Sequence, residues 1–275
     1  MASWIAATKA AATKAPAGLL LSGSAVSFVA IAVFGILVWL MVSRARSGQA
    51  LRPIRRLTAL DAIDEVIGRS TEMGQPVHYT MGLQGITDSG TIASLPVLGY
   101  VAGQCARYDT RLIQTSNDPI VYALVCEIIQ QAYLEAGRPE AYNPDDVRFL
   151  TQTQFAYTAG VFEVLQRERP GAQVLFGDFF GEALMIIEAG AAVGAVQIGA
   201  TQDVQQVPFF VAGCDYYLIG EEMYAASAYL SHDPLLTGTI VAEDLYKFLI
   251  FALIVAGVLA VNLGLPGFAT FLKNV

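Results

Sequence analysis

Two long apolar segments without a charged residue lie at opposite ends of the chain. Residues 19–42 (LLLSGSAVSFVAIAVFGILVWLMV) are uncharged over 24 positions, which is enough for a helix to cross a hydrocarbon core of roughly 30 Å. Residues 248–265 (FLIFALIVAGVLAVNLGL) are uncharged over 18 positions and are followed by Pro266. The sequence therefore predicts one transmembrane helix near each end, over residues 19–43 and 248–265.

Five arginines follow the first apolar segment: Arg44, Arg46, Arg52, Arg55 and Arg56. Lys and Arg clustered beside a span mark its cytoplasmic side. We therefore expect a two-pass protein of the cell membrane, with a cytoplasmic main domain and both termini outside. A cleaved signal peptide is the alternative for residues 1–43. The apolar segment is too long for one, however, and no small-residue cleavage site precedes the arginines.

The charge distribution separates the middle of the chain from its ends. The predicted parts are a translocated tail (1–18), a span (19–43), a basic linker (44–56), an acidic domain (57–247), a second span (248–265) and a C-terminal tail (266–275). The domain holds all 24 Asp and Glu residues and eight Lys and Arg, a formal net charge of −16. This charge repels phosphate backbones, so we expect the lipid bilayer as a partner and no nucleic acid.

The middle of the chain alternates between strand-like and helix-like segments. After an amphipathic helix that begins near residue 57, strands are predicted at residues 77–83, 111–115, 147–151, 173–176 and 195–200. Helical segments of a dozen or more residues separate them, which indicates parallel strands with helices on both faces. The next link is too short for such a crossover. Residues 207–212 are therefore expected to pair antiparallel at an edge, where Pro208 is tolerated, before a last helix over 218–229.

The fold class predicted from this pattern is a Rossmann-like, doubly wound α/β domain with a mostly parallel sheet and an antiparallel edge hairpin. In such sheets, ligands bind beyond the carboxyl ends of the strands. The candidate binding residues at those ends are Gly85, Thr87, Asp88, Ser89, Gly90, Ser116, Asn117, Asp118 and Asp178. The segment GITDSGT could hold an anion at a helix start. The same residue types also cap helices when no ligand is present, which is the favoured interpretation.

Catalytic chemistry finds little support in the sequence. The glycines at 82, 85 and 90 match neither the dinucleotide fingerprint nor a phosphate-binding loop with its lysine. Ser89 has no histidine near it in the sequence. We therefore assign no catalytic residue and expect no cofactor, and an enzyme is the less favoured interpretation.

A metal site and reactive thiols are also not expected. The three carboxylates Asp88, Asp118 and Asp178 could meet and bind Mg²⁺, but helix capping explains the same residues and is the favoured interpretation, so no metal site is predicted. The three cysteines, Cys105, Cys126 and Cys214, lack metal-ligand spacing and are expected to be free thiols.

The first span offers a surface for helix association. Gly23 and Ser27 form a small-xxx-small pair, and Asn262 in the second span could hydrogen-bond to another helix. A homo-oligomer, or an assembly with other membrane subunits, is the expected partner arrangement.

Three stretches carry a resemblance that covers nearly all of residues 57–265. They are HYTMGLQGITDSGTIASLPVLGYVA, RLIQTSNDPIVYALVCEIIQQAYLEAG and the segment from FFGEALMIIEAG to EEMYAASAYL. In these the chain resembles a family of uncharacterised prokaryotic integral membrane proteins known only as a domain of unknown function, which implies no activity or ligand. The leading hypothesis is a non-enzymatic membrane-anchored scaffold or assembly protein. The alternative is a membrane-bound sensor or enzyme that binds a small ligand at the carboxyl-end loops.

Overall fold

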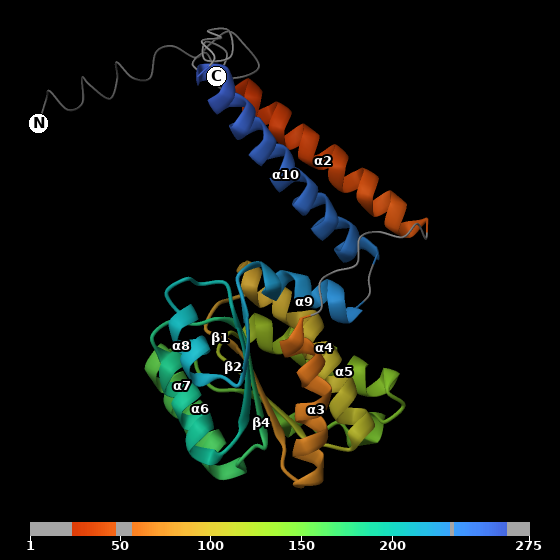
Figure 1. Ribbon diagram of the computed structural model, residues 1–275. Helices are drawn as coiled ribbons and strands as arrows, with labels where there is room; N and C mark the ends of the chain where they lie inside the picture. Colours follow the sequence, from red (N-terminus) through yellow and green to blue (C-terminus); the bar gives the residue numbers. More distant parts are fainter. Residues whose placement is uncertain (1–23, 48–56, 232–233, 263–275) are drawn as a thin grey trace, which may run out of the picture. The chain divides into compact units, whose positions relative to one another are not determined.

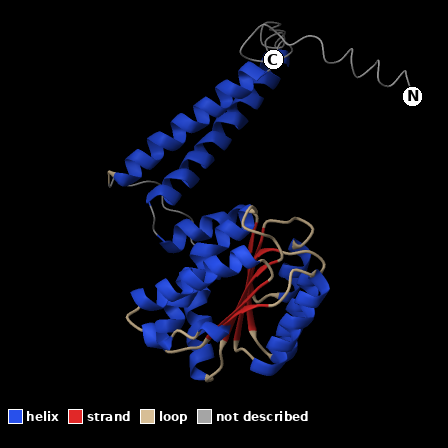
Figure 2. Ribbon diagram, turned by 180° about the vertical axis from the view of Figure 1, so that it is seen from behind, coloured by secondary structure: helices blue, strands red, loops and turns tan. Residues whose placement is uncertain are grey.

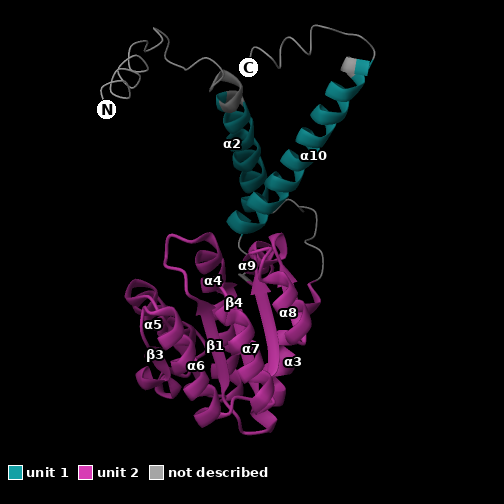
Figure 3. Ribbon diagram, turned by 90° about the vertical axis from the view of Figure 1, so that its left-hand side faces the viewer, with its two compact units in different colours: residues 1–52, 234–275 teal, residues 53–233 magenta. Residues whose placement is uncertain are grey.

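The computed structural model describes residues 24–47, 57–231 and 234–262. The chain divides into two compact units, residues 1–52 with 234–275 and residues 53–233 (Figure 3). In the first unit, the helices α2 (Ser24–Arg46) and α10 (Pro234–Asn262) pack on each other. The second unit is an α/β domain.

The contact between α2 and α10 depends on a glycine that the sequence pattern did not single out. A Cβ on Gly238 of α10 would lie 2.7 Å from the Cα of Val42, so only glycine permits this approach. The rings of Phe34 and Tyr246 are 5.1 Å apart between centroids. Asn262 donates to the carbonyl of Val258 in its own helix at 2.9 Å. Of the predicted association pair, Gly23 lies outside the described residues.

Apolar side chains face outward on both helices of this unit. Phe28, Ile31 and Trp39 of α2 are more than 60% exposed, as are Phe248 and Phe251 of α10. Among the described residues, no helix combines the length and apolar character needed to cross a membrane. The segments 19–43 and 248–265 each include residues outside the described ranges.

The α/β unit contains a six-stranded sheet in the order β3-β2-β1-β4-β5-β6, in which every neighbouring pair is parallel. The strands are β1 (Val77–Gly82), β2 (Leu112–Ser116), β3 (Val147–Phe149), β4 (Ala172–Asp178), β5 (Val196–Thr201) and β6 (Tyr216–Ile219). This order reverses between β1 and β4, which makes their carboxyl ends the topological switch point of a doubly wound sheet. The predicted Rossmann-like α/β fold is confirmed.

Helices cover both faces of the sheet (Figure 2). One face packs against α3 (Thr58–Glu72), α4 (Ser89–Tyr108), α5 (Pro119–Glu135) and α9 (Glu221–Ser231). The other packs against α6 (Gln154–Glu168), α7 (Glu182–Val193) and α8 (Val207–Gly213) (Figure 1). Two 3-10 turns, Pro139–Ala141 and Pro144–Asp146, connect α5 to β3. Because both faces are covered, the central strands are buried along their whole length.

The predicted antiparallel edge hairpin is wrong. Residues 207–213 form α8, and the edge strand β6 pairs parallel to β5. Pro208 lies in the first turn of α8, where its missing N–H is one of the donors that a helix leaves unpaired in any case. Phe210 is fully buried against Gly199 of β5, which has no side chain to obstruct it. A helix of seven residues is therefore enough for this crossover. The predicted helix over 218–229 is likewise divided, because β6 ends at Ile219 and α9 begins at Glu221.

Candidate functional site

The backbones of β1 and β4 touch where the two strands end. Gly82 has φ +84°, and a Cβ at this position would overlap the carbonyl oxygen of Asp178. A Cβ on Gly177 would in turn overlap the carbonyl oxygen of Met81. The amide of Leu83 donates to the carbonyl of Asp178 at 3.2 Å. Close contact between the two backbones therefore fixes the loop that follows β1 directly beside the end of β4.

The α4 helix begins on this loop and is capped by Asp88. The Oδ2 atom of Asp88 accepts from the amide of Thr91 at 3.0 Å, which satisfies one of the unpaired donors of the first turn. A Cβ on Gly90 would lie 2.9 Å from Oδ2 of Asp178 and 3.0 Å from Oδ2 of Asp88. The carboxylates of Asp88 and Asp178 therefore both lie next to Gly90, in space that a side chain at this position would occupy.

Asp178 is the buried member of this carboxylate pair. Asp178 is 8% exposed, and its Oδ2 accepts from the side-chain amide (Nε2) of Gln202. Its Oδ1 is buried and has no hydrogen-bond partner among the described residues. Burial raises the pKa of Asp178. Hydrogen bonding to the side chain and backbone of Gln202 opposes this rise, and the charge and hydrogen bonding of the nearby Asp88 carboxyl add to it. By the geometry of its contacts, Oδ1 of Asp178 is therefore a buried oxygen without a hydrogen-bond donor among the described residues.

Three polar side chains from different elements extend the site toward solvent. The Gln202 amide, beyond the end of β5, donates to Oγ of Ser89 at 3.2 Å. Ser89 also shares a hydrogen bond of 2.9 Å with the hydroxyl of Tyr224 in α9. Ser89 is one of the predicted binding residues. Gln202 follows the end of β5, where the sequence pattern expects polar residues, but no local pattern connects Tyr224 to this edge.

The candidates that follow β2 have structural partners of their own. Oδ1 of Asp118 accepts from the amides of Ile120 and Val121, each at 2.9 Å, and so caps α5. The side-chain amide of Asn117 donates to the carbonyl of Leu83 at 2.7 Å, and this hydrogen bond links the loop after β1 to the loop after β2.

The remaining candidates divide between these two groups. Ser116 hydrogen-bonds with Gln114, Gly85 lies beside Asp118, and Thr87 is exposed. The structure therefore brings together Asp88, Ser89, Gly90 and Asp178 and leaves the β2 candidates in capping and loop-fixing roles.

A comparison with protein families matches residues 18–272 to the domain of unknown function DUF6754. The chain belongs to the DUF6754 family. The match spans both the helix pair and the α/β unit of this DUF6754 chain, and it confirms the resemblance to an uncharacterised family. Neither the curated proteins nor the solved structures contain a match to it.

Metal ligands do not gather in the described part of the DUF6754 chain. No group of three or more His, Cys, Asp or Glu side chains there could hold a metal ion. Of the three carboxylates considered for Mg²⁺, Asp88 and Asp178 lie close together, whereas Asp118 caps the neighbouring helix. The pair alone could still contribute to a Mg²⁺ site, since Mg²⁺ is often held by one or two carboxylates with water.

The cysteines of the DUF6754 chain are free thiols, as predicted. Burial raises the pKa of Cys214 to about 12, with a further contribution from Asp215, and burial also raises the pKa of Cys105. Both side chains are buried, so they are protonated and poorly nucleophilic at neutral pH. Neither supplies chemistry to the switch point.

Proposed function

We propose that this chain is a membrane-anchored binding protein whose α/β unit takes a small polar ligand at the switch point between β1 and β4. The unpartnered Oδ1 of Asp178 carries this proposal. A buried acceptor without a donor costs about 1–3 kcal/mol, and more when the group is charged. A ligand hydroxyl or amine would provide the missing donor. Sites that keep such a cost in the free protein are commonly functional.

The charges at the site favour one class of ligand. A helix start usually attracts anions, but the start of α4 already faces the carboxylate of Asp88. With Asp178 beside it, a phosphate would be a third anionic group in a small volume. Uncharged or cationic compounds that carry several hydroxyl or amino groups, such as sugars, nucleosides and polyamines, fit the pair of carboxylates better.

Binding is favoured over catalysis by the surroundings of Ser89. Its hydroxyl pairs with Gln202 and Tyr224, neither of which is a base at neutral pH. Within the described residues, His78 is the one histidine, and it hydrogen-bonds to Thr115 inside the sheet at 3.1 Å. Burial, followed by the charge of Arg148, lowers the pKa of His78 to about 3.

The proposed ligand test uses the full chain in detergent. Thermal unfolding is recorded with glucose, adenosine and spermidine, and separately with inorganic phosphate and with MgCl₂. We expect a saturable rise in melting temperature with at least one of the first three, which Ser89→Ala weakens and Asp145→Asn leaves intact. Asp145 is an exposed carboxylate on a 3-10 turn and serves as the matched control. A response to phosphate alone, or no response at all, overturns the proposal, whereas a response to Mg²⁺ alone would replace it with a cation site.

Membrane anchoring is proposed for the helix pair. Its support is the outward-facing apolar side chains of α2 and α10 together with the uncharged sequence that continues beyond the described residues. A cytoplasmic α/β unit with external termini is favoured by the arginines that follow the first apolar segment. Arg44 and Arg46 lie in the last turn of α2, and Arg52, Arg55 and Arg56 are outside the described ranges.

Alkaline carbonate extraction of membranes should leave the chain in the pellet. Protease added to intact cells should remove an N-terminal or C-terminal tag and spare the domain. Release by carbonate, or protection of both tags, contradicts the anchoring or the orientation.

A scaffold function is the second candidate, and exposed apolar residues on the α6–α7 side favour it. Phe155 and Phe162 lie seven positions apart on α6, and they are 73% and 50% exposed. Leu184 and Met185 are exposed on the adjacent helix α7. Light scattering of the detergent-solubilised chain should then give an oligomer mass that Phe155→Ser with Leu184→Ser reduces to that of a monomer. A wild-type chain that is monomeric at all concentrations and yields no crosslinked partner excludes this function.

A further inference from the structure

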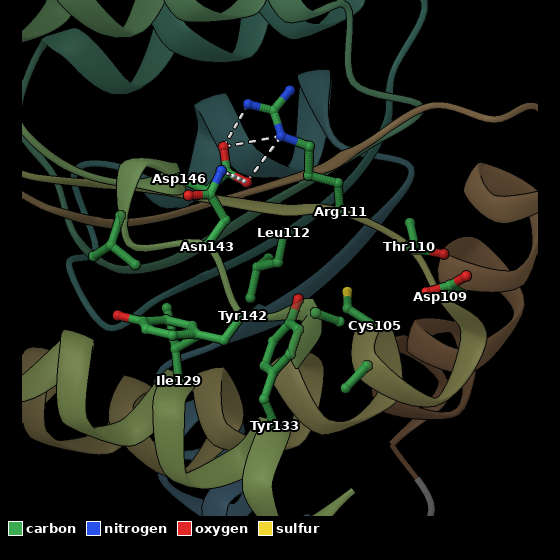
Figure 4. A pocket seen from close by; sticks show the side chains of 13 residues that line it. Cys105, Asp109, Thr110, Arg111, Leu112, Ile129, Tyr133, Tyr142, Asn143 and Asp146 are labelled. Carbon is green, nitrogen blue, oxygen red and sulfur yellow. Dashed lines mark hydrogen bonds and ion pairs between the residues drawn. The ribbon is translucent and has the colours of Figure 1, made fainter. Parts of the chain in front are cut away.

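A cavity of about 310 Å³ lies at the amino edge of the sheet, at the opposite end of the strands from the switch point. Its walls come from the end of α4, the C-terminal half of α5, the start of β2 and the 3-10 turns before β3 (Figure 4). Pockets for small molecules start at roughly this size and are mostly apolar with a few fixed polar groups. None of the predicted site residues lines this cavity.

The floor of the cavity is apolar and closely packed. Cys105, Leu112, Ile129 and Val147 line it, and each is at most 4% exposed. Tyr133 and Tyr142 add aromatic surface, with ring centroids 6.0 Å apart in an edge-on arrangement. Aromatic walls of this kind favour flat rings, through stacking or edge contacts.

The rim of the cavity is polar and held by ion pairs. Nε of Arg111 donates to both carboxylate oxygens of Asp146 at 2.9 Å, and Nη1 donates to Glu168 at 2.8 Å. Burial opposes ionisation of Glu168, but hydrogen bonds from Arg148 and Arg111 outweigh it and lower the pKa of Glu168 to about 2. Figure 4 shows the Arg111–Asp146 pair on one side of the cavity and the two tyrosine rings on the other.

These ion pairs decide which charge a ligand can carry. Arg111 and Arg148 share the carboxylates of Asp146 and Glu168, so two positive charges are matched by two negative ones and the cluster offers little attraction to an anionic ligand. Asp109 on the rim is likewise paired with Arg138 at 2.8 Å.

The carboxylate of Asp146 already accepts from Arg111 and from the side-chain amide of Asn143. The side-chain oxygen of Asn143 accepts only from the amide of Asp145 among the described residues, at 3.2 Å, so a lone pair remains there for a ligand donor. The tyrosine rings would also attract a cation through their π faces.

We propose that this cavity is a second binding site, for a small flat ring compound that is neutral or singly cationic. The ring lies against Tyr133, Tyr142 and Leu112, and an amino group of the ligand donates toward the side-chain oxygen of Asn143. The site is separate from the switch point and does not depend on the function proposed there.

The test uses 2-aminobenzimidazole as the probe, with benzoate as an anionic ring and cyclohexylamine as a non-aromatic amine. Binding to the full chain in detergent is followed by ligand-detected NMR. Ala141→Trp places a large ring at the exposed rim of the cavity, and Ala191→Trp is the matched control on an exposed position of α7. Tyr142→Ala is the second variant, in case the first does not fold.

We expect saturable binding of 2-aminobenzimidazole that weakens at least tenfold in Ala141→Trp or Tyr142→Ala and is unchanged in Ala191→Trp. Benzoate should bind at least tenfold more weakly. Absence of saturable binding, equal binding to all four proteins, or preference for benzoate or cyclohexylamine would each overturn the proposal.

Discussion

Gly82 of β1 and Asp178 of β4 are in direct backbone contact, and no side chain can be accommodated between them. This contact lies at the point where the strand order reverses. It sets the loop that carries Asp88 beside the buried carboxylate of Asp178. The glycine therefore connects the topology of the sheet to the geometry of the candidate site.

Substitution of this glycine should be much more harmful than substitution of an open one. Gly82→Ala adds a clash with fixed backbone to the cost of a positive φ, and we expect a loss of about 3 kcal/mol or more. Gly74 has φ +64°, and a methyl group at this position would meet no atom within 4 Å, so Gly74→Ala should cost only about 1–2 kcal/mol. Urea unfolding followed by circular dichroism measures both. Equal losses would show that the contact at Gly82 carries no special strain.

Asp178→Asn should stabilise the protein at neutral pH. The pKa of Asp178 is raised in the folded state. Its carboxyl therefore contributes to the free energy of unfolding below the unfolded-state pKa of 3.8, and this contribution is lost as the pH rises through the folded-state pKa. An amide keeps the shape, carries no charge and can donate to Asp88. The melting temperature of the variant should exceed that of the wild type at pH 7, and the difference should shrink as the pH is lowered toward 4. A destabilised variant at pH 7 would mean that the ionised carboxylate is satisfied in a way the contacts do not reveal.

Asp118→Ala should lower the free energy of unfolding and leave ligand binding unchanged. Asp118 caps α5 through two amides, and loss of such a cap costs about 1 kcal/mol. Asp118→Asn should retain most of the cap and thus most of the stability. Thermal unfolding gives the first quantity, and the ligand-induced shift in melting temperature gives the second. A loss of ligand response in both variants would extend the binding site to the β2 loop.

Acid should destabilise the α/β unit through His78. Its folded pKa of about 3 lies below the unfolded value of 6.5, so the unfolded state binds more protons between these values. The contribution of neutral His78 to the free energy of unfolding is fully present above pH 6.5. It falls as the pH drops, at up to about 1.4 kcal/mol per pH unit for this one group. His78→Gln should remove this part of the slope between pH 6.5 and 5. An unchanged slope, or a His78 ring that titrates near 6.5 by NMR, would contradict the buried neutral imidazole.

Most of the strands and helices before residue 202 were predictable because they have a strong local signal. Asp118 followed by Pro119 marks the start of α5, and the strand composition of residues 77–83 marks β1 to within one residue. The short crossover after β5 was not predictable by the same means. A seven-residue helix leaves no periodicity to detect, and its burial depends on the contact of Phe210 with Gly199, which is set by tertiary packing.

The candidate site was predictable only in part. Asp88, Ser89, Gly90 and Asp178 follow strand ends, so the rule for open α/β sheets locates them. That rule does not distinguish the switch point from the neighbouring edge, because strand order is absent from the sequence, and Asp118 was therefore grouped with them. Tyr224 comes from a helix that follows the last strand, and the cavity near Tyr133 lies at the amino edge, where the rule gives no expectation.

The central claim is that the unpartnered oxygen of Asp178 receives a donor from a ligand. The most direct measurement is a calorimetric titration of the full chain and of Asp178→Asn, in the same detergent at pH 7, with glucose, adenosine and spermidine. Since a hydrogen bond to a charged group contributes about 1.5–3 kcal/mol, the variant should bind at least one of these at least tenfold more weakly than the wild type. Equal affinity in both proteins, or no heat of binding in the wild type with any of the three, would contradict the claim.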